Sequence, residues 1–286
     1  MTSFPGEQAP PKKRYELSNL ALRILTGAIV LPVVLLCAVW GGWWFTGLVS
    51  LLMSVGVMEF CALGRSRGVE GNAPVGVAVA VGVIVGFHLQ NPALWLGAPL
   101  LGAVLLFVLE LARRGDARRA ATVVLATLGA VLYIGFPSGM LVATRNLPDG
   151  LTWLMLIFAM TWATDSFAYI GGRVWGRTKL APSISPKKTL EGAVVGVIGG
   201  VIAGGIVLGS GGKFSAVALA PVAAGPLLAI IGDLVESGLK RGFGVKDSHV
   251  MGFDILPGHG GVLDRVDGLV LVATMTYLYI RISGLA

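Results

Sequence analysis

The sequence predicts an all-α integral membrane protein with about nine transmembrane helices. Hydrophobic residues make up 55% of the 286 residues, and the mean hydropathy of +0.82 is far above that of soluble domains. Apolar runs of about twenty residues recur along the chain, and each is long enough to cross a bilayer core as a helix. These runs show no sustained alternation of apolar and polar residues, which argues against transmembrane strands.

The predicted spans follow one another with mostly short connections. They are residues 22–40, 44–63, 74–89, 93–112, 120–144, 152–171, 190–209, 215–237 and 262–282. Before them lies a polar and basic tail, residues 1–21, which lacks the features of a cleavable signal peptide. Cys37 and Cys61 lie inside apolar runs, and we interpret both as small core residues.

Basic residues predict the orientation of these spans. With the N-terminus in the cytoplasm and the C-terminus outside, 19 of the 22 Lys and Arg residues fall in cytoplasmic segments. Only Arg145, Lys213 and Arg281 fall outside. Topology and attraction to anionic lipid headgroups therefore explain the net charge of +7, and we expect no nucleic-acid partner.

Acidic residues gather near the cytoplasmic ends of the last four predicted spans. Carboxylates at membrane depth are costly and normally face a cavity, a cation or a partner. Six of them at one level predict a shared polar chamber that opens to the cytoplasm. These are Asp165, Glu191, Asp233, Glu236, Asp264 and Asp267.

The end of the eighth span carries five polar residues on one helical face, at spacings i, i+3, i+4, i+7 and i+8. They are Asp233, Glu236, Ser237, Lys240 and Arg241. A snorkelling helix end with an ion pair between Glu236 and Lys240 explains part of this pattern. It leaves Asp233 unexplained, because that carboxylate lies a turn deeper.

A glycine-rich loop over residues 242–261 leads into Asp264, Arg265 and Asp267. Glycines let backbone amides wrap phosphate oxygens, although such loops are also ordinary connectors. One Asp would serve as a helix cap, but two with an Arg exceed that role. His259 fits a base or a phosphate contact and fits an ordinary hydrogen-bonded loop residue equally well.

A second polar cluster spans residues 171–192 and holds five basic residues. Ser185, Lys187, Lys188 and Thr189 lead directly into a helix that Thr189 caps, with Glu191 in its first turn. Backbone amides at a helix start, together with two lysines, predict an anion site for a polyphosphate.

Residues of the sixth span at spacings i, i+4 and i+8 share a helical face, together with Gly172 at i+7, and we expect them to face the same chamber. They are Asp165, Tyr169 and Arg173. In the seventh span, Gly192, Gly196, Gly200 and Gly204 form a ridge that predicts close helix packing, either within the monomer or across a homodimer. A homodimer therefore stays open.

These motifs resemble those of the CDP-diacylglycerol synthase (phosphatidate cytidylyltransferase) family. The resemblance covers roughly residues 165–267 and includes the element SPKKT-x-EG at residues 185–192. The other matching residues are Ser237, Lys240, Arg241, Lys246, Asp247, His259, Gly260, Gly261, Asp264, Arg265 and Asp267. The chain is about four residues longer than the family pattern around His249–Asp254, so Asp254 receives no role.

The resemblance implies an enzyme that converts CTP and phosphatidate to CDP-diacylglycerol and pyrophosphate in the plasma membrane. It divides residues 22–286 into N-terminal helices (22–144) and a catalytic part (152–282). It implies Mg²⁺, with a second metal ion left open, on Asp233 and Asp264 and more weakly on Asp267. Lys187 and Lys188 would act at the triphosphate.

The same resemblance implies a wider set of substrate-binding residues: Asp165, Tyr169, Arg173, Ser185, Thr189, Glu191, Ser237, Lys240, Arg241, Lys246, Asp247, His259 and Arg265. A CTP-dependent lipid or polyprenol kinase remains the alternative, because it needs similar groups. A CDP-alcohol phosphotransferase is disfavoured, since its DG-x-x-AR motif is absent from the sequence. A transporter is also disfavoured, since the carboxylates crowd one side without an evident repeat.

Overall fold

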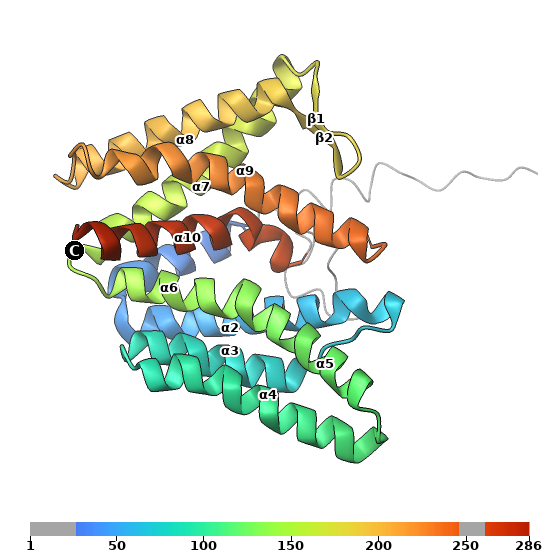
Figure 1. The fold of residues 1–286 in the computed structure, drawn as a ribbon. Coiled ribbons are helices and arrows are strands. Elements are labelled where there is room, and N and C mark those ends of the chain that lie inside the picture. The colour runs from blue at the N-terminus through green and yellow to red at the C-terminus, as the bar shows by residue number, and fades with distance from the viewer. Residues whose placement is uncertain (1–26, 246–260, 286) are drawn as a thin grey trace, which may run out of the picture.

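The computed structural model describes residues 27–245 and 261–285, and it is a bundle of antiparallel helices (Figure 1). Its first described helix is Gly27–Trp40. The remaining elements are α2 (Gly42–Leu63), the 3₁₀ turn η1 (Gly64–Arg67), α3 (Ala73–His88), α4 (Pro92–Arg114), α5 (Ala117–Ala130), the π-helical turn η2 (Val131–Gly135), α6 (Phe136–Arg145), α7 (Gly150–Val174), β1 (Lys179–Ala181), β2 (Ser185–Thr189), α8 (Leu190–Ser210), α9 (Leu219–Gly242) and α10 (Leu263–Ser283).

Seven helices of the described part are long and apolar enough to cross a membrane, with α5, η2 and α6 forming one of them. Two shorter apolar helices, Gly27–Trp40 and Ala73–His88, occupy the places of the other two predicted spans. The predicted order of apolar helices is therefore confirmed, and the protein is a multi-pass membrane protein. The sequence analysis did not expect the small antiparallel hairpin of β1 and β2, which interrupts the all-α pattern.

Short polar side chains begin several of the helices, as their sequence positions suggest. Each accepts a hydrogen bond from an amide of the first turn, which has no partner within the helix. The capping residues are Asn72 for α3, Asn91 for α4, Asp116 for α5 and Thr189 for α8. The cap that the sequence predicts at Thr189 is confirmed.

A proline explains why the long helix from Ala117 to Arg145 widens in its middle. Pro137 has no amide hydrogen, so the carbonyl of Tyr133 loses its usual partner four residues on. The chain responds with the π-helical turn η2, in which the amide of Phe136 donates to the carbonyl of Val131. This wider turn lies directly before the proline, and it changes the direction in which the following turn faces.

Helix α10 lies at the centre of the bundle. It contacts α2 and α6 on one side and α7 and α9 on the other, so it joins the N-terminal helices to the C-terminal ones (Figure 1). Its side chains Leu263, Val272, Ala273 and Ile280 are fully buried in the hydrophobic core. The position of α10 therefore depends on both halves of the chain.

The glycine ridge of α8 packs within the chain, against α7 and α9. A Cβ atom at Gly196 would lie 2.8 Å from the Ala168 Cβ and 2.8 Å from the Thr164 carbonyl oxygen. At Gly200 it would meet the Thr164 hydroxyl and Pro226 of α9. The expectation of close packing within the monomer is confirmed, and the homodimer stays a prediction.

The described basic residues are distributed unequally between the two ends of the helix bundle. The ends of α2, α4, α7 and α9 and the starts of α3, α5, α8 and α10 lie on the same side of the bundle as the hairpin (Figure 1). We call this the charged end, because it carries 14 of the described Lys and Arg residues, against three at the opposite end. The three are Arg145, Lys213 and Arg281.

We expect Gly196→Ala to lower the thermal stability of the detergent-solubilised protein. The added methyl group would press on the α7 backbone, and such overpacking costs about 1–3 kcal/mol. Gly205→Ala on the same helix is the matched control, because a Cβ there meets nothing within 4 Å. Equal midpoints for both variants in differential scanning fluorimetry would contradict the packing role of the ridge.

Candidate active site

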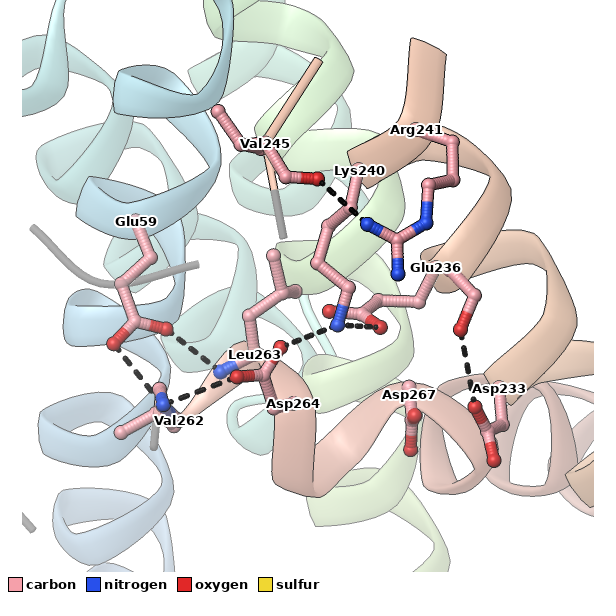
Figure 2. A network of polar contacts seen from close by, with 12 residues as sticks. Glu59, Asp233, Glu236, Lys240, Arg241, Val245, Val262, Leu263, Asp264 and Asp267 are labelled. Carbon is pink, nitrogen blue, oxygen red and sulfur yellow. Dashed lines mark hydrogen bonds and ion pairs between the residues drawn. The ribbon is translucent and has the colours of Figure 1, made fainter. Parts of the chain in front are cut away.

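A close approach of α9 and α10 places the acidic residues of the two helices next to each other. A Cβ atom at Gly232 would collide with the backbone carbonyl of Asp267, and one at Gly268 would lie 3.0 Å from the carbonyl of Ala229. Because both glycines lack a side chain, the two backbones touch. Asp233 follows the first glycine and Asp267 precedes the second, so their carboxylates share one small region (Figure 2).

Lys240 connects two carboxylates of this region. Its Nζ atom lies 2.7 Å from Glu236 Oε2 and 2.7 Å from Asp264 Oδ1 (Figure 2). Glu236 is 1% exposed, and the Lys240 side chain is 12% exposed. The predicted Glu236–Lys240 ion pair is therefore confirmed, and the same ammonium also reaches α10. These ion pairs stabilise the fold, because a buried carboxylate without a partner would lower the free energy of unfolding.

Lys188 links the hairpin to Asp233. Its ammonium forms an ion pair with Asp233 Oδ2, while Ser237 Oγ donates to Asp233 Oδ1 over 3.4 Å. Arg241 adds a second link, because its Nε atom donates to the carbonyl of Ile184 in the hairpin turn over 3.4 Å. The polar cluster at residues 171–192 and the end of α9 thus lie together, as the sequence predicts.

Three carboxylates from three helices lie within electrostatic range of one another: Asp165 of α7, Asp233 of α9 and Asp267 of α10. Lys188 acts on Asp165 and on Asp267, and Arg265 acts on Asp165. The structure therefore brings acidic and basic residues that the sequence predicts into one group, which we call the polar site: Asp165, Lys188, Asp233, Arg265 and Asp267. Asp165 and Arg265 are also exposed on the surface of the protein.

The two lysines of the SPKKT element differ in their surroundings. They lie on β2, where successive side chains point to opposite faces, rather than in the first turn of a helix. Lys188 contacts Asp233, whereas Lys187 is exposed. An anion held by both lysines would therefore have to reach around the strand, and the polyphosphate site stays a prediction.

Several predicted binding residues serve the local structure. Glu191 accepts hydrogen bonds from the amides of Arg177 and Thr178 and so ties the chain before β1 to the start of α8. Thr189 caps α8 and is buried. Ser185 pairs with Ala181 in the hairpin.

Tyr169 and Arg173 lie on α7 and contact each other. Arg173 Nη1 donates to the Tyr169 hydroxyl over 3.2 Å, and both side chains are exposed. Lys246, Asp247 and His259 lie outside the described residues, as does the longer segment around 249–254.

Sequence analysis missed Glu59 of α2. Its carboxylate is 4% exposed and accepts hydrogen bonds from the amides of Val262 and Leu263, at 3.0 and 2.8 Å. These amides lie 203 and 204 residues after Glu59 in the sequence, at the start of α10 (Figure 2). A single acid inside an apolar span is a signal for such a contact, because a charge at membrane depth needs a partner.

Sequence analysis also missed Tyr133, which lies on the π-helical turn. Its buried hydroxyl has no hydrogen-bond partner among the described residues. It lies within electrostatic range of Asp267, Glu236 and Asp233. Pro137, four residues later, was the available signal. A proline inside a helix can cause a π-helical turn, and such turns occur often at functional sites.

The carboxylates provide oxygen donors of the type that Mg²⁺ prefers. Asp165, Asp233 and Asp267 fit this chemistry by their donor atoms and mutual proximity. In the described part of the chain, however, no three His, Cys, Asp or Glu side chains converge tightly enough to form a metal centre as they stand. Asp264 accepts hydrogen bonds from Lys240 and from the amide of Gly261.

The fold and this cluster define a polytopic membrane protein whose last four helices hold a polar site at one end of the bundle. The sequence matches the model of the cytidylyltransferase family over residues 21–283. The chain belongs to this family.

Named relatives agree with this assignment over nearly the whole chain. Phosphatidate cytidylyltransferase of Brucella abortus biovar 1 (strain 9-941) is 37% identical over 272 residues, covering 92% of this chain and 94% of the relative. That of Thermotoga maritima is 33% identical over 274 residues, covering 93% and 98%. Phosphatidate cytidylyltransferase 4, chloroplastic, of Arabidopsis thaliana is 34% identical over 310 residues, covering 95% and 76%.

We expect Tyr133→Phe to leave the thermal midpoint unchanged or to raise it. The variant removes a buried hydroxyl that has no partner, and such a group carries a desolvation penalty of about 1–3 kcal/mol. Tyr279→Phe is the control, because it deletes a hydroxyl that donates to the Val217 carbonyl over 3.0 Å. A fall in the Tyr133→Phe midpoint larger than that of the control would show a partner in the folded protein.

Proposed function

We propose that the protein transfers the cytidylyl group of CTP to phosphatidate, giving CDP-diacylglycerol and pyrophosphate. The observation that carries this proposal is the group of Asp165, Lys188, Asp233, Arg265 and Asp267, which three helices and the hairpin assemble at one end of a membrane bundle. The relatives named as phosphatidate cytidylyltransferases support it over nearly the full length of the chain.

The chemistry needs little proton transfer. A phosphate oxygen of the lipid attacks the α-phosphorus of CTP in line, the new P–O bond forms, and the bond to the β-phosphate oxygen breaks. The attacking oxygen is already anionic, so no strong general base is required. The main barrier is repulsion between the phosphates, which fixed cations and metal ions overcome.

Three of the described cations would oppose this repulsion. Lys188 and Arg265 lie beside the acidic group, and Lys240 lies within the neighbouring ion-pair network. Lys188 is the better candidate for the triphosphate, because it is close to Asp233, while exposed Lys187 would bind a more distant phosphate. Arg241 supports the arrangement by holding the hairpin turn.

We propose that Mg²⁺ binds through Asp233 and Asp267, with Asp264 contributing from beside Lys240. When bound, Mg²⁺ would neutralise charge on the phosphate oxygens and help to orient them. The close approach of α9 and α10 holds the first two carboxylates at one level, and Ser237 donates to Asp233.

We further propose that the charged end faces the cytoplasm and that the N-terminus is cytoplasmic. The excess of described basic residues at this end supports the orientation. Because Asp165 and Arg265 are exposed, phosphatidate would enter laterally from the bilayer, with its headgroup at the interface and its acyl chains in the lipid. CTP would arrive from the cytoplasm.

We expect Asp233→Asn and Asp267→Asn to reduce turnover roughly 100-fold, because each removes a charge from the metal-binding group. The assay follows CTP labelled at its α-phosphate, with phosphatidate and Mg²⁺ in detergent micelles. Asp149→Asn is the control for the same chemical change, since Asp149 pairs with Lys213 at the opposite end. Near-normal turnover in both site variants would contradict the metal assignment.

The position of the label tests the reaction itself. The proposed function places the α-phosphate label in the lipid product, with release of pyrophosphate. A CTP-dependent lipid kinase would leave this label in CDP, and that result would replace the proposed function. Mg²⁺ titration of the wild type in the same assay counts the activating ions through the steepness of the curve.

We expect a cysteine at Arg177 to react with membrane-impermeant maleimide only from the cytoplasmic face, and one at Lys213 only from the outer face. Both variants are made in a chain that lacks Cys37 and Cys61, and labelling is compared in intact cells and inverted vesicles. Arg177 lies before the hairpin at the charged end, and Lys213 lies in the turn between α8 and α9. The reverse pattern would invert the proposed topology.

A further inference from the structure

The start of α10 is fixed by two carboxylates that come from different parts of the chain. Glu59 of α2 accepts hydrogen bonds from the amides of Val262 and Leu263, and Asp264 accepts one over 3.2 Å from the amide of Gly261 (Figure 2). Three successive amides are therefore occupied. Glu59 provides two of these three contacts although it belongs to the N-terminal helices.

A carboxylate suits this position for a physical reason. The first amides of a helix have no partner within the helix, and they carry the positive end of the helix dipole. The N-cap residue of α10 is Val262, which has no side chain that can accept a hydrogen bond. Glu59 performs this capping from another helix, and its burial strengthens the interaction because water does not compete.

This contact lies beside the carboxylates that α10 provides to the polar site. Asp264 lies in the first turn of α10, directly after the two capped residues, and Asp267 lies one turn later. A shift or rotation at the start of α10 would move both carboxylates relative to Asp233 on α9. Changes of about 1 Å in such a site can reduce a rate roughly 100-fold.

We propose that Glu59 is a positioning residue of the active site. It holds the start of α10 so that Asp264 and Asp267 face Lys240 and Asp233, and it makes the N-terminal helices part of the catalytic apparatus. In this proposal Glu59 acts through the amides of Val262 and Leu263. The inference rests on the proposed function for its rate measurements, whereas the geometry of the carboxylates can be tested by metal binding alone.

The N-terminal helices contain a suitable control for Glu59. Glu110 of α4 is 5% exposed, nearly as buried as Glu59, and its carboxylate forms ion pairs with Arg113 and Arg114 of the same helix. Glu110→Gln therefore makes the same chemical change at a similarly buried acid. Among the described residues, Glu110 pairs with Arg113 and Arg114 and with no residue of the polar site.

The test compares Glu59→Gln, Glu59→Asp and Glu110→Gln. In Glu59→Gln one amide keeps an oxygen acceptor, but the other faces an NH₂ group. We expect kcat to fall at least about 10-fold and the affinity for Mn²⁺, measured by electron paramagnetic resonance without substrates, to weaken by a similar factor. KM for CTP should change much less. Glu59→Asp keeps the charge and should recover part of both losses.

Assays run well below each variant's thermal midpoint separate positioning from folding. If the proposal holds, Glu110→Gln keeps the wild-type kcat and Mn²⁺ affinity, even where its thermal midpoint falls. Wild-type kcat and Mn²⁺ affinity in folded Glu59→Gln would overturn the positioning role. If Glu59→Gln does not fold, Glu59→Asp decides, and wild-type values there would also overturn it.

The proposed function can fail separately. A wild type that binds Mn²⁺ but does not convert phosphatidate would overturn the proposed function, while the Mn²⁺ affinities of the Glu59 variants would still test the positioning role. A wild type that shows neither property would overturn both.

Discussion

The contact between the backbones of α9 and α10 is the constraint on which the polar site depends. Gly232 and Gly268 remove the side chains that would otherwise separate the two helices. Asp233 and Asp267 are adjacent to these glycines, so close packing also forces two carboxylates together. Like charges held so near one another repel, and the structure offsets this repulsion with Lys188 from the hairpin, which pairs with Asp233 and acts on Asp267. Arg265 acts on the third carboxylate, Asp165.

Each half of the chain contributes to the resulting arrangement. The C-terminal helices and the hairpin provide most of the charged side chains. The N-terminal helices provide Glu59, which caps α10, and Tyr133, whose buried hydroxyl is directed by a proline-induced π-helical turn into electrostatic range of the acidic group. Helix α10 is the element through which the halves meet, because it packs against α2, α6, α7 and α9.

The hairpin has a structural and a chemical task. Glu191 and Thr189 fasten it to the start of α8, and Lys188 and Arg241 attach it to α9. These contacts hold a basic segment over the charged end without a transmembrane helix of its own. An enzyme that joins a soluble nucleotide to a membrane lipid needs cations where the phosphate groups of the two substrates meet.

The sequence by itself determined the order of the apolar helices, the cap at Thr189 and the Glu236–Lys240 pair, because length, hydropathy and local spacing involve residues close together in the chain. The family was indicated by the resemblance of the motifs in residues 165–267. It did not reveal the hairpin, the separate surroundings of Lys187 and Lys188, or the capping of α10 by Glu59. Those depend on strand geometry and on contacts between residues about 200 positions apart. Only packing in three dimensions decides such contacts, and it placed Asp267 beside Asp233 and Asp264 beside Lys240.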